Sequence, residues 1–465
     1  MTDHLLFLTG RLARPRLEKV LQGMAPAPFD WTVLDVGVKV AALMTEPILM
    51  GRLPRPLHAD RVVLPGRCRA DLDRLTAAFG VPFERGPEEL KDLPAYFGKR
   101  GAPPDLSRYA IKIFAEIVDA PHLGVDALVA RANALKATGA DVIDIGCLPD
   151  TPFPHLEDAV RALKDAGLTV SVDSYDTQEL RRGATAGADF LLSLTEHTLD
   201  IAAATRATPI LVPATHGDLA SLCRAAEEAE RRGIRAILDP VLDPIHFGFA
   251  DSLARYRDLR ARLPNAEILM GTGNLTELTD ADSVGVTAIL LGICSELRID
   301  HVLTVQVSPH TRRTIEEHDA ARRILYAARA EGALPKGFGR ALLQIHDRSP
   351  FPNTSAEIAE IATQVKDANF RIETAEDGVH VYNRAGHHVA GDAFSLFEQL
   401  GVEKDGPHAF YLGAELTKAE IAFKLAKRYA QDEPLDWGCA TDRPTEDRTR
   451  FRDAGHTLRR QERKD

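Results

Sequence analysis

The chain has 465 residues and a formal net charge of −11 at neutral pH. Nucleic acids and anionic membrane surfaces are both polyanions, so this charge excludes broad electrostatic binding to either of them. Hydrophobic residues make up 45% of the chain and charged residues 27%, a composition that can bury the cores of two or three domains. A globular protein that acts on a small molecule is the class that fits best.

Five cysteines, an odd number, lie far apart and form no Cys-x-x-Cys pair. This pattern indicates neither a disulfide framework nor a zinc knuckle. The first residues, MTDHLLFLTGRLARPRLEK, contain too short an apolar run for a signal peptide or a membrane span. We therefore expect a cytoplasmic protein.

Residues 1–98 alternate short apolar runs with helical stretches, which predicts a small open α/β domain of Rossmann-like type. The runs LLFLTG, WTVLDV and RVVLPG predict strands, and residues 15–24, 39–50 and 68–79 predict helices. In LLFLTGRLARPRL a glycine lies between strand and helix, where helix N-terminal amides can hold an anion. Simple turn chemistry explains the same glycine. Residues 87–107, with four prolines, predict a linker.

Residues 109–332 repeat a strand-then-helix pattern, and helices such as DALVARANALKATG end in glycine, as helix C-caps prefer. Eight alternations over this length predict a (β/α)8 TIM barrel, with an open doubly wound sheet as the alternative. A further apolar segment, residues 301–308, leaves the choice of closing strand open. The predicted strands are residues 111–118, 141–146, 169–174, 189–194, 209–214, 235–240, 267–272 and 287–292.

Residues 335–440 predict a small α+β domain, with a β-hairpin, a helix and then the helix ELTKAEIAFKLAKRYAQ. The apolar stripe of this last helix indicates a packing face or a homodimer contact. Residues 441–465 form a charged tail that we expect to be frayed.

Acidic and polar residues gather where the barrel strands are predicted to end, and this is the end of a (β/α)8 barrel that carries the site. One such carboxylate can be a helix cap, but several together indicate a site. In ILDPVLDP we assign Asp239 to the strand end and Asp243 to shaping the loop after it. The residues at these predicted strand ends are Glu116, Asp119, Asp141, Asp144, Asp173, Glu196, His197, Thr215, His216, Asp239, Gly271, Thr272, Gly273 and Asn274.

Two kinds of chemistry suit these residues. One is the metal centre of a hydrolase, with His216, Asp239 and Glu196 or His197 as ligands. The other is recognition of a 2-amino-4-oxo-pyrimidine ring, because a carboxylate can accept two parallel N–H bonds from it. Two opposed carboxylates and an amide would hold a pterin by its polar edges.

Four motifs carry a resemblance to the pterin-binding barrels, which include dihydropteroate synthase and the folate- and corrinoid-linked methyltransferases. They are GADVIDIG (139–146), VSVDSYD (170–176), ILDP (237–240) and LMGTGN (269–274), in the order and spacing of that family. The resemblance implies that Asp173 lies at the pterin ring and that Asp239 pairs with its 2-amino group. Asn274 resembles the strand-seven asparagine of the methyltransferases. We expect these three residues to be catalytic, and Asp144, Ser193, His216, Gly271, His310, Arg312 and Arg313 to bind substrate.

The opening FLTGRLA and the late segment YLGAELTKAEIAFKLAKRYAQDEPLDWG extend this resemblance over nearly the whole chain. The chain resembles dihydropteroate synthase-related proteins of methanogens and methylotrophs, which are associated with tetrahydromethanopterin biosynthesis. The implied reaction joins a 6-hydroxymethyl-dihydropterin diphosphate to an arylamine such as 4-(β-D-ribofuranosyl)aminobenzene 5′-phosphate. Mg²⁺ would assist departure of the diphosphate.

The chain departs from the synthase pattern at strand seven, where Gly273 and Asn274 stand in place of a lysine. His310, Arg312 and Arg313 could supply charge for a phosphate, or could cap the following helix. The absent lysine favours an alternative, a pterin-dependent methyltransferase acting with a separate corrinoid protein. A further alternative is a pterin-binding protein without catalysis.

Overall fold

The computed structural model describes residues 3–38, 41, 44–68, 70–87, 90–98 and 104–442. Parts of the helix predicted at 39–50 and of the linker at 87–107, and nearly all of the tail, lie outside the described residues. No helix among the described residues is long and apolar enough to cross a membrane. Two compact units divide the chain: the first is Met1–Pro104, Leu343–Gly438 and Asp442–Asp465, and the second is Asp105–Leu342 and Cys439–Thr441.

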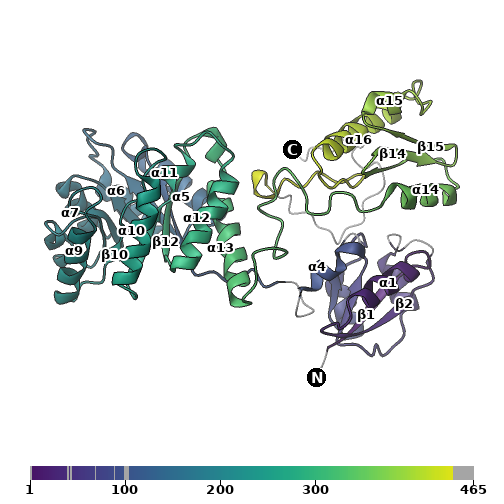
Figure 1. The fold of residues 1–465 in the computed structure, drawn as a ribbon, viewed down its shortest axis with the longest axis horizontal. Coiled ribbons are helices and arrows are strands. Elements are labelled where there is room, and N and C mark those ends of the chain that lie inside the picture. The colour runs from purple at the N-terminus through teal and green to yellow at the C-terminus, as the bar shows by residue number, and fades with distance from the viewer. Residues whose placement is uncertain are drawn as a thin grey trace. The chain divides into compact units, whose positions relative to one another are not determined.

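The second unit is a closed barrel of parallel strands in the order β10-β11-β12-β5-β6-β7-β8-β9, drawn in blue, teal and green in Figure 1. This closure confirms the predicted (β/α)8 fold and rules out the open doubly wound sheet. The strands are β5 (Lys112–Ile117), β6 (Val142–Gly146), β7 (Val170–Asp173), β8 (Phe190–Leu194), β9 (Thr208–Leu211), β10 (Ile237–Leu238), β11 (Glu267–Gly271) and β12 (His301–Val305). The helices are α5 (Val125–Thr138), α6 (Leu156–Asp165), α7 (Thr177–Ala186), α8 (Leu199–Ala203), α9 (Leu219–Arg231), α10 (Phe249–Arg262), α11 (Gly273–Thr276), α12 (Ser283–Leu297) and α13 (Thr314–Ala330).

The prediction of a strand at residues 287–292 is wrong, because these residues lie inside the helix α12. The barrel is closed instead by β12, which pairs with β11 on one side and with β5 on the other. The run TAILLG is apolar throughout, and such a run shows neither the helical nor the strand period. Its place was decided by tertiary packing, since Leu290, Leu291 and Cys294 are buried against the outside of the barrel.

Side chains that point into the barrel form an apolar layer: Phe114, Val142, Leu192, Ile210, Ile237 and Leu269. Successive residues of a strand point to opposite faces, so the next inward position lies two residues further along. On β5 and β6 these next positions are Glu116 and Asp144, and after β10 it is Asp239. The alternation of the strands therefore places carboxylates directly above a sealed apolar floor.

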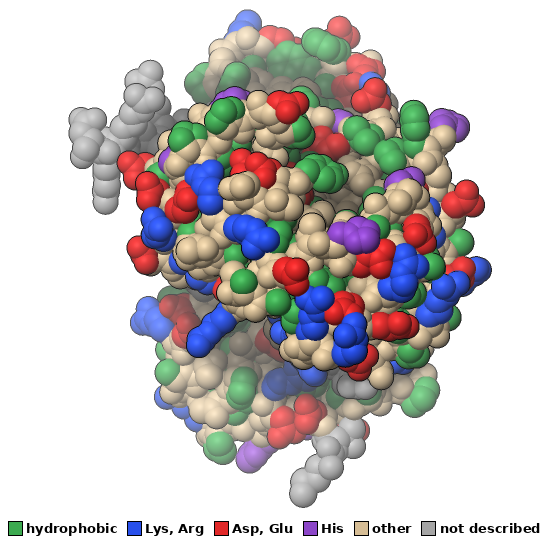
Figure 2. Space-filling view, turned by 90° about the vertical axis from the view of Figure 1, so that its left-hand side faces the viewer, with side chains coloured by type: hydrophobic (Ala, Val, Ile, Leu, Met, Phe, Trp, Pro, Cys, Tyr) green, Lys and Arg blue, Asp and Glu red, His purple; other side chains and the backbone are tan. Residues whose placement is uncertain are grey.

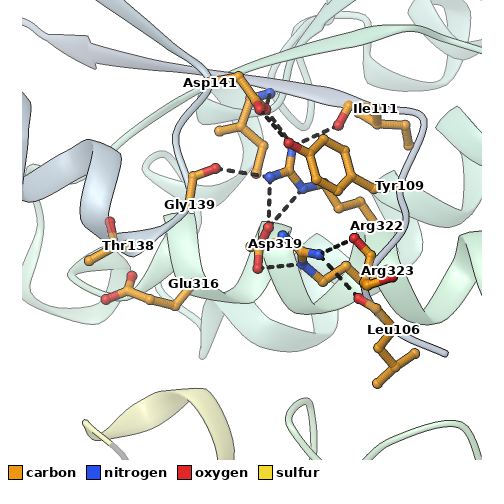
Figure 3. A network of polar contacts seen from close by, with 12 residues as sticks. Leu106, Tyr109, Ile111, Thr138, Gly139, Asp141, Glu316, Asp319, Arg322 and Arg323 are labelled. Carbon is orange, nitrogen blue, oxygen red and sulfur yellow. Dashed lines mark hydrogen bonds and ion pairs between the residues drawn. The ribbon is translucent and has the colours of Figure 1, made fainter. Parts of the chain in front are cut away.

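The opposite, amino end of the barrel is held by a network around the buried Arg322 of α13 (Figure 3). Its guanidinium donates to the carbonyl oxygens of Ile111 and Gly139, and it pairs with Asp319 and Asp141. The ring of Tyr109 lies 3.6 Å from the guanidinium carbon. The network ties the last helix of the barrel to its first two strands.

In the first unit, the N-terminal segment forms a parallel sheet in the order β2-β1-β3-β4. Alternate residues of β1 enter two cores: Leu5 and Phe7 face one, and Leu6 and Leu8 face the other. Helices cover both faces, so this segment is the α/β domain that the sequence predicts. Its elements are β1 (His4–Thr9), α1 (Arg14–Gly23), β2 (Asp30–Asp35), α2 (Glu46–Arg52), β3 (Arg61–Leu64), α3 (Leu72–Phe79), β4 (Phe83–Arg85) and α4 (Leu93–Phe97).

The C-terminal segment of the same unit is an antiparallel sheet with helices, the predicted α+β architecture. The predicted hairpin gains a third strand, and α16 packs Leu412, Leu416 and Ala419 against the sheet. Its elements are α14 (Ser355–Gln364), β13 (Arg371–Ala375), β14 (Gly378–Asn383), β15 (Gly386–Ala390), α15 (Ala393–Phe397) and α16 (Gly406–Lys424).

Figure 2 shows one side of the barrel unit, on which acidic and basic side chains are interspersed. Arg182 with Glu157 and Arg224 with Glu196 are examples of the pairs that bridge neighbouring barrel elements. On this face the charges alternate in sign instead of forming a broad basic surface.

Candidate functional site

Three carboxylates converge at the carboxyl end of neighbouring strands. Glu116 on β5 lies directly opposite Asp144 on β6, and Asp173 on β7 lies opposite Gly146, two residues further along β6. One oxygen from each of Glu116, Asp144 and Asp173 lies within 4.8 Å of the others. The register of three adjacent strands therefore builds an acidic cluster at the barrel mouth, which we call the carboxylate triad.

Little in the protein balances the negative charge of this triad. Asp144 is fully buried, and neither of its carboxylate oxygens has a hydrogen-bond partner among the described residues. Burial and the neighbouring Asp144 raise the pKa of Glu116 to about 8. Burial also raises the pKa of Asp144 to about 6, against a smaller lowering by the nearby Ser171 hydroxyl. Burial and the other acids together lift the pKa of Asp173 well above its usual range.

Gly146 makes room for the triad. A Cβ atom at this position would lie 2.7 Å from Oε1 of Glu116, so any other residue would displace the carboxylate. The glycine of the VIDIG motif is thus required by close approach across strands. Its conformation needs no glycine, because it is not among the residues with positive φ.

Asp239 lies across the mouth from Asp173, close enough to contribute to the raised pKa of Asp173. Its Oδ1 accepts hydrogen bonds from the Tyr256 hydroxyl at 2.7 Å and from the Val241 amide at 2.8 Å. Both bonds go to the same oxygen, so Oδ2 is the atom left for a ligand. Burial raises the pKa of Asp239 to about 6.

Asp243 has different surroundings, although it also precedes a proline. Its Oδ2 pairs with Arg255 at 2.7 Å and its Oδ1 with His216 at 3.2 Å. Arg255 also donates to the carbonyl oxygens of Pro240 and Val241. Asp243 therefore holds the loop after β10 together, in agreement with the loop-shaping role that we assigned to it.

Asn274 lies in α11, directly after the end of β11, and is exposed. Its side-chain amide donates to the Leu242 carbonyl oxygen at 2.7 Å. The bond joins the loop after β11 to the loop after β10 and fixes Asn274 near the strand ends. Gly271 is the last residue of β11.

The remaining residues predicted to bind substrate lie in varied surroundings, and their roles stay predictions. Ser193 is half-buried in β8, and His216 is exposed beside Asp243. His310 bonds to the Thr276 carbonyl oxygen, and Arg312 is exposed. Arg313 donates to the Cys439 carbonyl oxygen and pairs with Glu316, so its guanidinium has structural partners within the barrel unit.

The hydrolase ligand set is not assembled among the described residues. Glu196 forms two bonds to Arg224, at 2.9 and 2.8 Å, and His216 pairs with Asp243. Among the described residues, the triad is the group of three acidic, histidine or cysteine side chains whose ligand atoms all lie within 4.8 Å of one another. The tertiary structure thus moves the candidate metal centre from strands four to six to the first three strands.

Asp141 was wrongly placed among the strand-end residues. It precedes β6 and belongs to the Arg322 network at the amino end of the barrel (Figure 3). Each strand residue advances the chain by about 3.3 Å, so Asp141 and Asp144 lie about 10 Å apart along β6. Asp119, beyond β5, pairs with Arg131 at 3.2 Å.

Sequence reasoning placed Glu116 at a strand end without giving it a role, and it did not select Ser171 or Tyr256 at all. Glu116 and Ser171 could have been found by counting inward positions along each strand from Phe114 and Asp173. Tyr256 had no such signal, because its contact with Asp239 depends on how α10 packs.

Large apolar side chains are exposed on loops at the same end of the barrel. They follow β7, β10, β11 and β12, so they lie at the end of the barrel at which the acidic strand ends lie. Four of them, with their exposed fractions, are Tyr175 (88%), Phe247 (78%), Leu278 (64%) and Val307 (60%). A mouth with an acidic centre and an apolar rim suits a small aromatic ligand with polar edges.

The glycine-containing turn of LLFLTGRLARPRL lines a cavity of about 970 Å³ in the first unit. Thr9, Arg16 and Arg67 contribute to its wall, but so do Glu357 and Glu373. Arg16 donates to Asn353 at 3.0 Å and lies 3.5 Å from Glu357. Because acidic and basic side chains both line this cavity, its charge does not indicate an anion-binding site.

The fold and the site together define a (β/α)8-barrel protein with an acidic mouth, whose chain also forms the first unit with its α/β and α+β segments. A family of unknown function, DUF6513, matches residues 3–88. An uncharacterised protein of Methanocaldococcus jannaschii is 28% identical over 369 residues, 70% of this chain and 69% of that protein.

Solved structures similar to the barrel include three dihydropteroate synthases. The enzyme of Xanthomonas albilineans in complex with 7,8-dihydropteroate is 24% identical, over 50% of this chain and 96% of that one, with a TM-score of 0.35. The enzyme of Yersinia pestis with a pterine-sulfa conjugate is 20% identical, over 49% and 95%, with a TM-score of 0.37. The enzyme of Vibrio fischeri is 14% identical, over 49% and 95%, with a TM-score of 0.38.

Proposed function

We propose that the chain binds a pterin at the barrel mouth and transfers the exocyclic methylene carbon of that pterin to an arylamine. The observation that carries the proposal is a pair of carboxylates, the half-buried Asp173 and the buried Asp239, which face each other across the mouth within the VSVDSYD and ILDP motifs. A pterin ring presents N–H donors along one edge, and charge-assisted bonds to carboxylates are strong where water is excluded.

In this proposal, Oδ2 of Asp239 accepts an N–H bond from the 2-amino-4-oxo edge, because Oδ1 already accepts two bonds. Asp173 meets the ring from the other side, and the Asn274 side chain lies at its edge. The apolar rim, with Tyr175 and Phe247, offers surface for the aromatic ring of the second substrate.

The reaction would break the bond between the exocyclic carbon and the diphosphate oxygen, with the bonding pair leaving on the diphosphate. The arylamine nitrogen would form the new bond to that carbon and then lose a proton. The arylamine we propose is 4-(β-D-ribofuranosyl)aminobenzene 5′-phosphate, which would place the reaction in tetrahydromethanopterin biosynthesis. Exposed Arg312 is the residue we propose for its phosphate, since Arg313 is paired with Glu316.

The test is to incubate the full chain with the dihydropterin diphosphate, the arylamine and Mg²⁺, and to measure coupled product and released diphosphate. The proposal expects both in equal amounts, and expects Asp239→Asn to abolish them. Asp251→Asn is the matched control, because Asp251 is exposed on α10, the helix that carries Tyr256. Absence of product with both true substrates would overturn the synthase reaction.

A methyltransferase is the second candidate, and Asn274 at the position of the synthase lysine favours it. In this reaction Asn274 would hydrogen-bond near N5 of a methylated pterin, and a separate corrinoid protein would take the methyl group. Transfer of the methyl group to cob(I)alamin under reducing conditions would support the methyltransferase. If no transfer occurs, this candidate is excluded. A pterin complex that turns over with neither partner would instead indicate a binding protein.

A further inference from the structure

The carboxylate triad lacks a counter-charge. Among the described residues, no lysine, arginine or histidine forms an ion pair with Glu116, Asp144 or Asp173. Bringing three ionised carboxylates together in a buried site is strongly unfavourable unless protons or a cation neutralise them. The site is therefore neutralised either by protons, in line with the raised pKa values of the three acids, or by a cation from outside the described part of the chain.

A second observation, independent of the number of acids, points to a ligand. Ser171 lies directly opposite Asp144 on β7 and is fully buried. Its hydroxyl is near enough to lower the pKa of Asp144, but it has no partner in hydrogen-bonding geometry among the described residues, and neither has either oxygen of Asp144. Leaving a buried polar group unsatisfied costs about 1–3 kcal/mol, so the fully buried Asp144, which has an oxygen within 4.8 Å of oxygens of Glu116 and Asp173, is best explained by a ligand bound among these three acids.

We propose that Glu116, Asp144 and Asp173 hold a divalent cation of the Mg²⁺ or Mn²⁺ class. The donors are all carboxylate oxygens, which hard cations prefer, and the triad contains no histidine or cysteine of the kind that zinc favours. Three ligands from one side leave coordination positions open for water or for oxygens of a substrate. Gly146 keeps the space beside Glu116 free of a side chain.

The role of this cation rests on the proposed function, whereas its binding does not. When bound, it would supply positive charge to the diphosphate on the β5 to β7 side of the mouth. The chain needs that charge, because Gly273 and Asn274 replace the lysine and Arg313 is paired with Glu316. Asp173 would give one oxygen to the cation and the other to the pterin, which links the two ligands.

The test is titration of the full chain, purified in EDTA and then freed of it, with MnCl₂ by calorimetry and by electron paramagnetic resonance. We expect one Mn²⁺ per chain, competition by Mg²⁺, and a rise in the unfolding temperature on binding. Glu116→Gln and Asp144→Asn should each weaken Mn²⁺ binding at least tenfold. Asp119→Asn is the matched control, because Asp119 is an acid just beyond β5, the strand that carries Glu116, but it pairs with Arg131 instead of joining the triad.

Each variant removes one of three neighbouring like charges, so its unfolding temperature in EDTA should be no lower than that of the wild type, and this measurement distinguishes a loss of Mn²⁺ binding from poor folding. No bound Mn²⁺, or equal binding by wild type, Glu116→Gln and Asp144→Asn, would overturn the proposal. Pterin binding in EDTA without any Mn²⁺ binding would reject the cation and keep the proposed function. Mn²⁺ binding without pterin binding would support the cation site and reject the proposed function.

Discussion

Glu116 and Asp144 face each other in register on two adjacent barrel strands, with no basic residue of the described chain paired to either. Like charges directly opposite on neighbouring strands repel each other, and burial strengthens the repulsion. The pair therefore reduces the stability of the metal-free protein. Natural proteins keep such arrangements at sites where a ligand relieves them.

Replacing Glu116 by glutamine should stabilise the metal-free protein, because the glutamine has no charge to repel Asp144 and no proton to bind on folding. We expect a gain of about 1–3 kcal/mol at pH 7 in EDTA, smaller than the raised pKa alone would give. Urea unfolding of both proteins measures it. A clear loss of stability would show that Glu116 is held by contacts other than those described.

Asp239→Asn should weaken pterin binding, whereas Asp243→Asn should lower the stability of the protein. An asparagine in place of Asp239 would offer the pterin edge an uncharged acceptor, so we expect binding to weaken about 10- to 100-fold with little change in stability. Loss of the buried pair between Asp243 and Arg255 should cost about 3 kcal/mol of stability and leave pterin affinity nearly unchanged in the folded protein. Fluorescence titration with a pterin and urea unfolding separate the two effects, and equal loss of binding in both variants would contradict the division.

Arg322→Ala should strongly destabilise the barrel unit. Its guanidinium is buried between Asp141 and Asp319 and beneath Tyr109 (Figure 3), so its removal leaves Asp141 without an ion-pair partner and Asp319 with Arg323 alone. Breaking a buried ion pair costs about 3–5 kcal/mol. Arg131→Ala, which removes a half-exposed pair with Asp119, should cost about 0–1 kcal/mol and serves as the control in the same unfolding measurement.

His318 should make the protein lose stability in mild acid. Burial lowers the pKa of His318 to about 4, and its ring bonds to the Thr314 carbonyl oxygen and the Thr272 hydroxyl. The unfolded chain protonates this histidine near its ordinary pKa of about 6.5, so the folded state loses stability as pH falls from about 6.5 toward 4. Thermal unfolding of His318→Gln against pH should show a shallower decline over this window than the wild type. Parallel curves would mean that His318 does not contribute.

Local sequence was sufficient for most of the barrel. Seven of the predicted strands correspond to β5 to β11, and helices such as α5 end at the predicted glycine, because each element's period and cap are written in a few adjacent residues. The prediction of a strand at residues 287–292 was wrong because such a prediction depends on this periodicity. A run that is apolar on every side shows neither the helical nor the strand period. Only packing against the barrel decided that TAILLG is a helix and that HVLTV is the strand that closes the ring.

The site divides in a similar way. The motifs around Asp173 and Asp239 could be recognised from their own residues, and the separation of Asp239 from Asp243 followed from where the strand ends. The meeting of Glu116, Asp144 and Asp173 could not be recognised, because it depends on the register of three strands that are distant in sequence. The burial of Asp144 and Ser171 without partners, which points to a cation, exists only in the folded barrel. Sequence by itself determined most of the residues at the strand ends, with Asp141 as an exception. Tertiary structure decided which of these residues share one space, because that depends on how the strands align when the barrel closes.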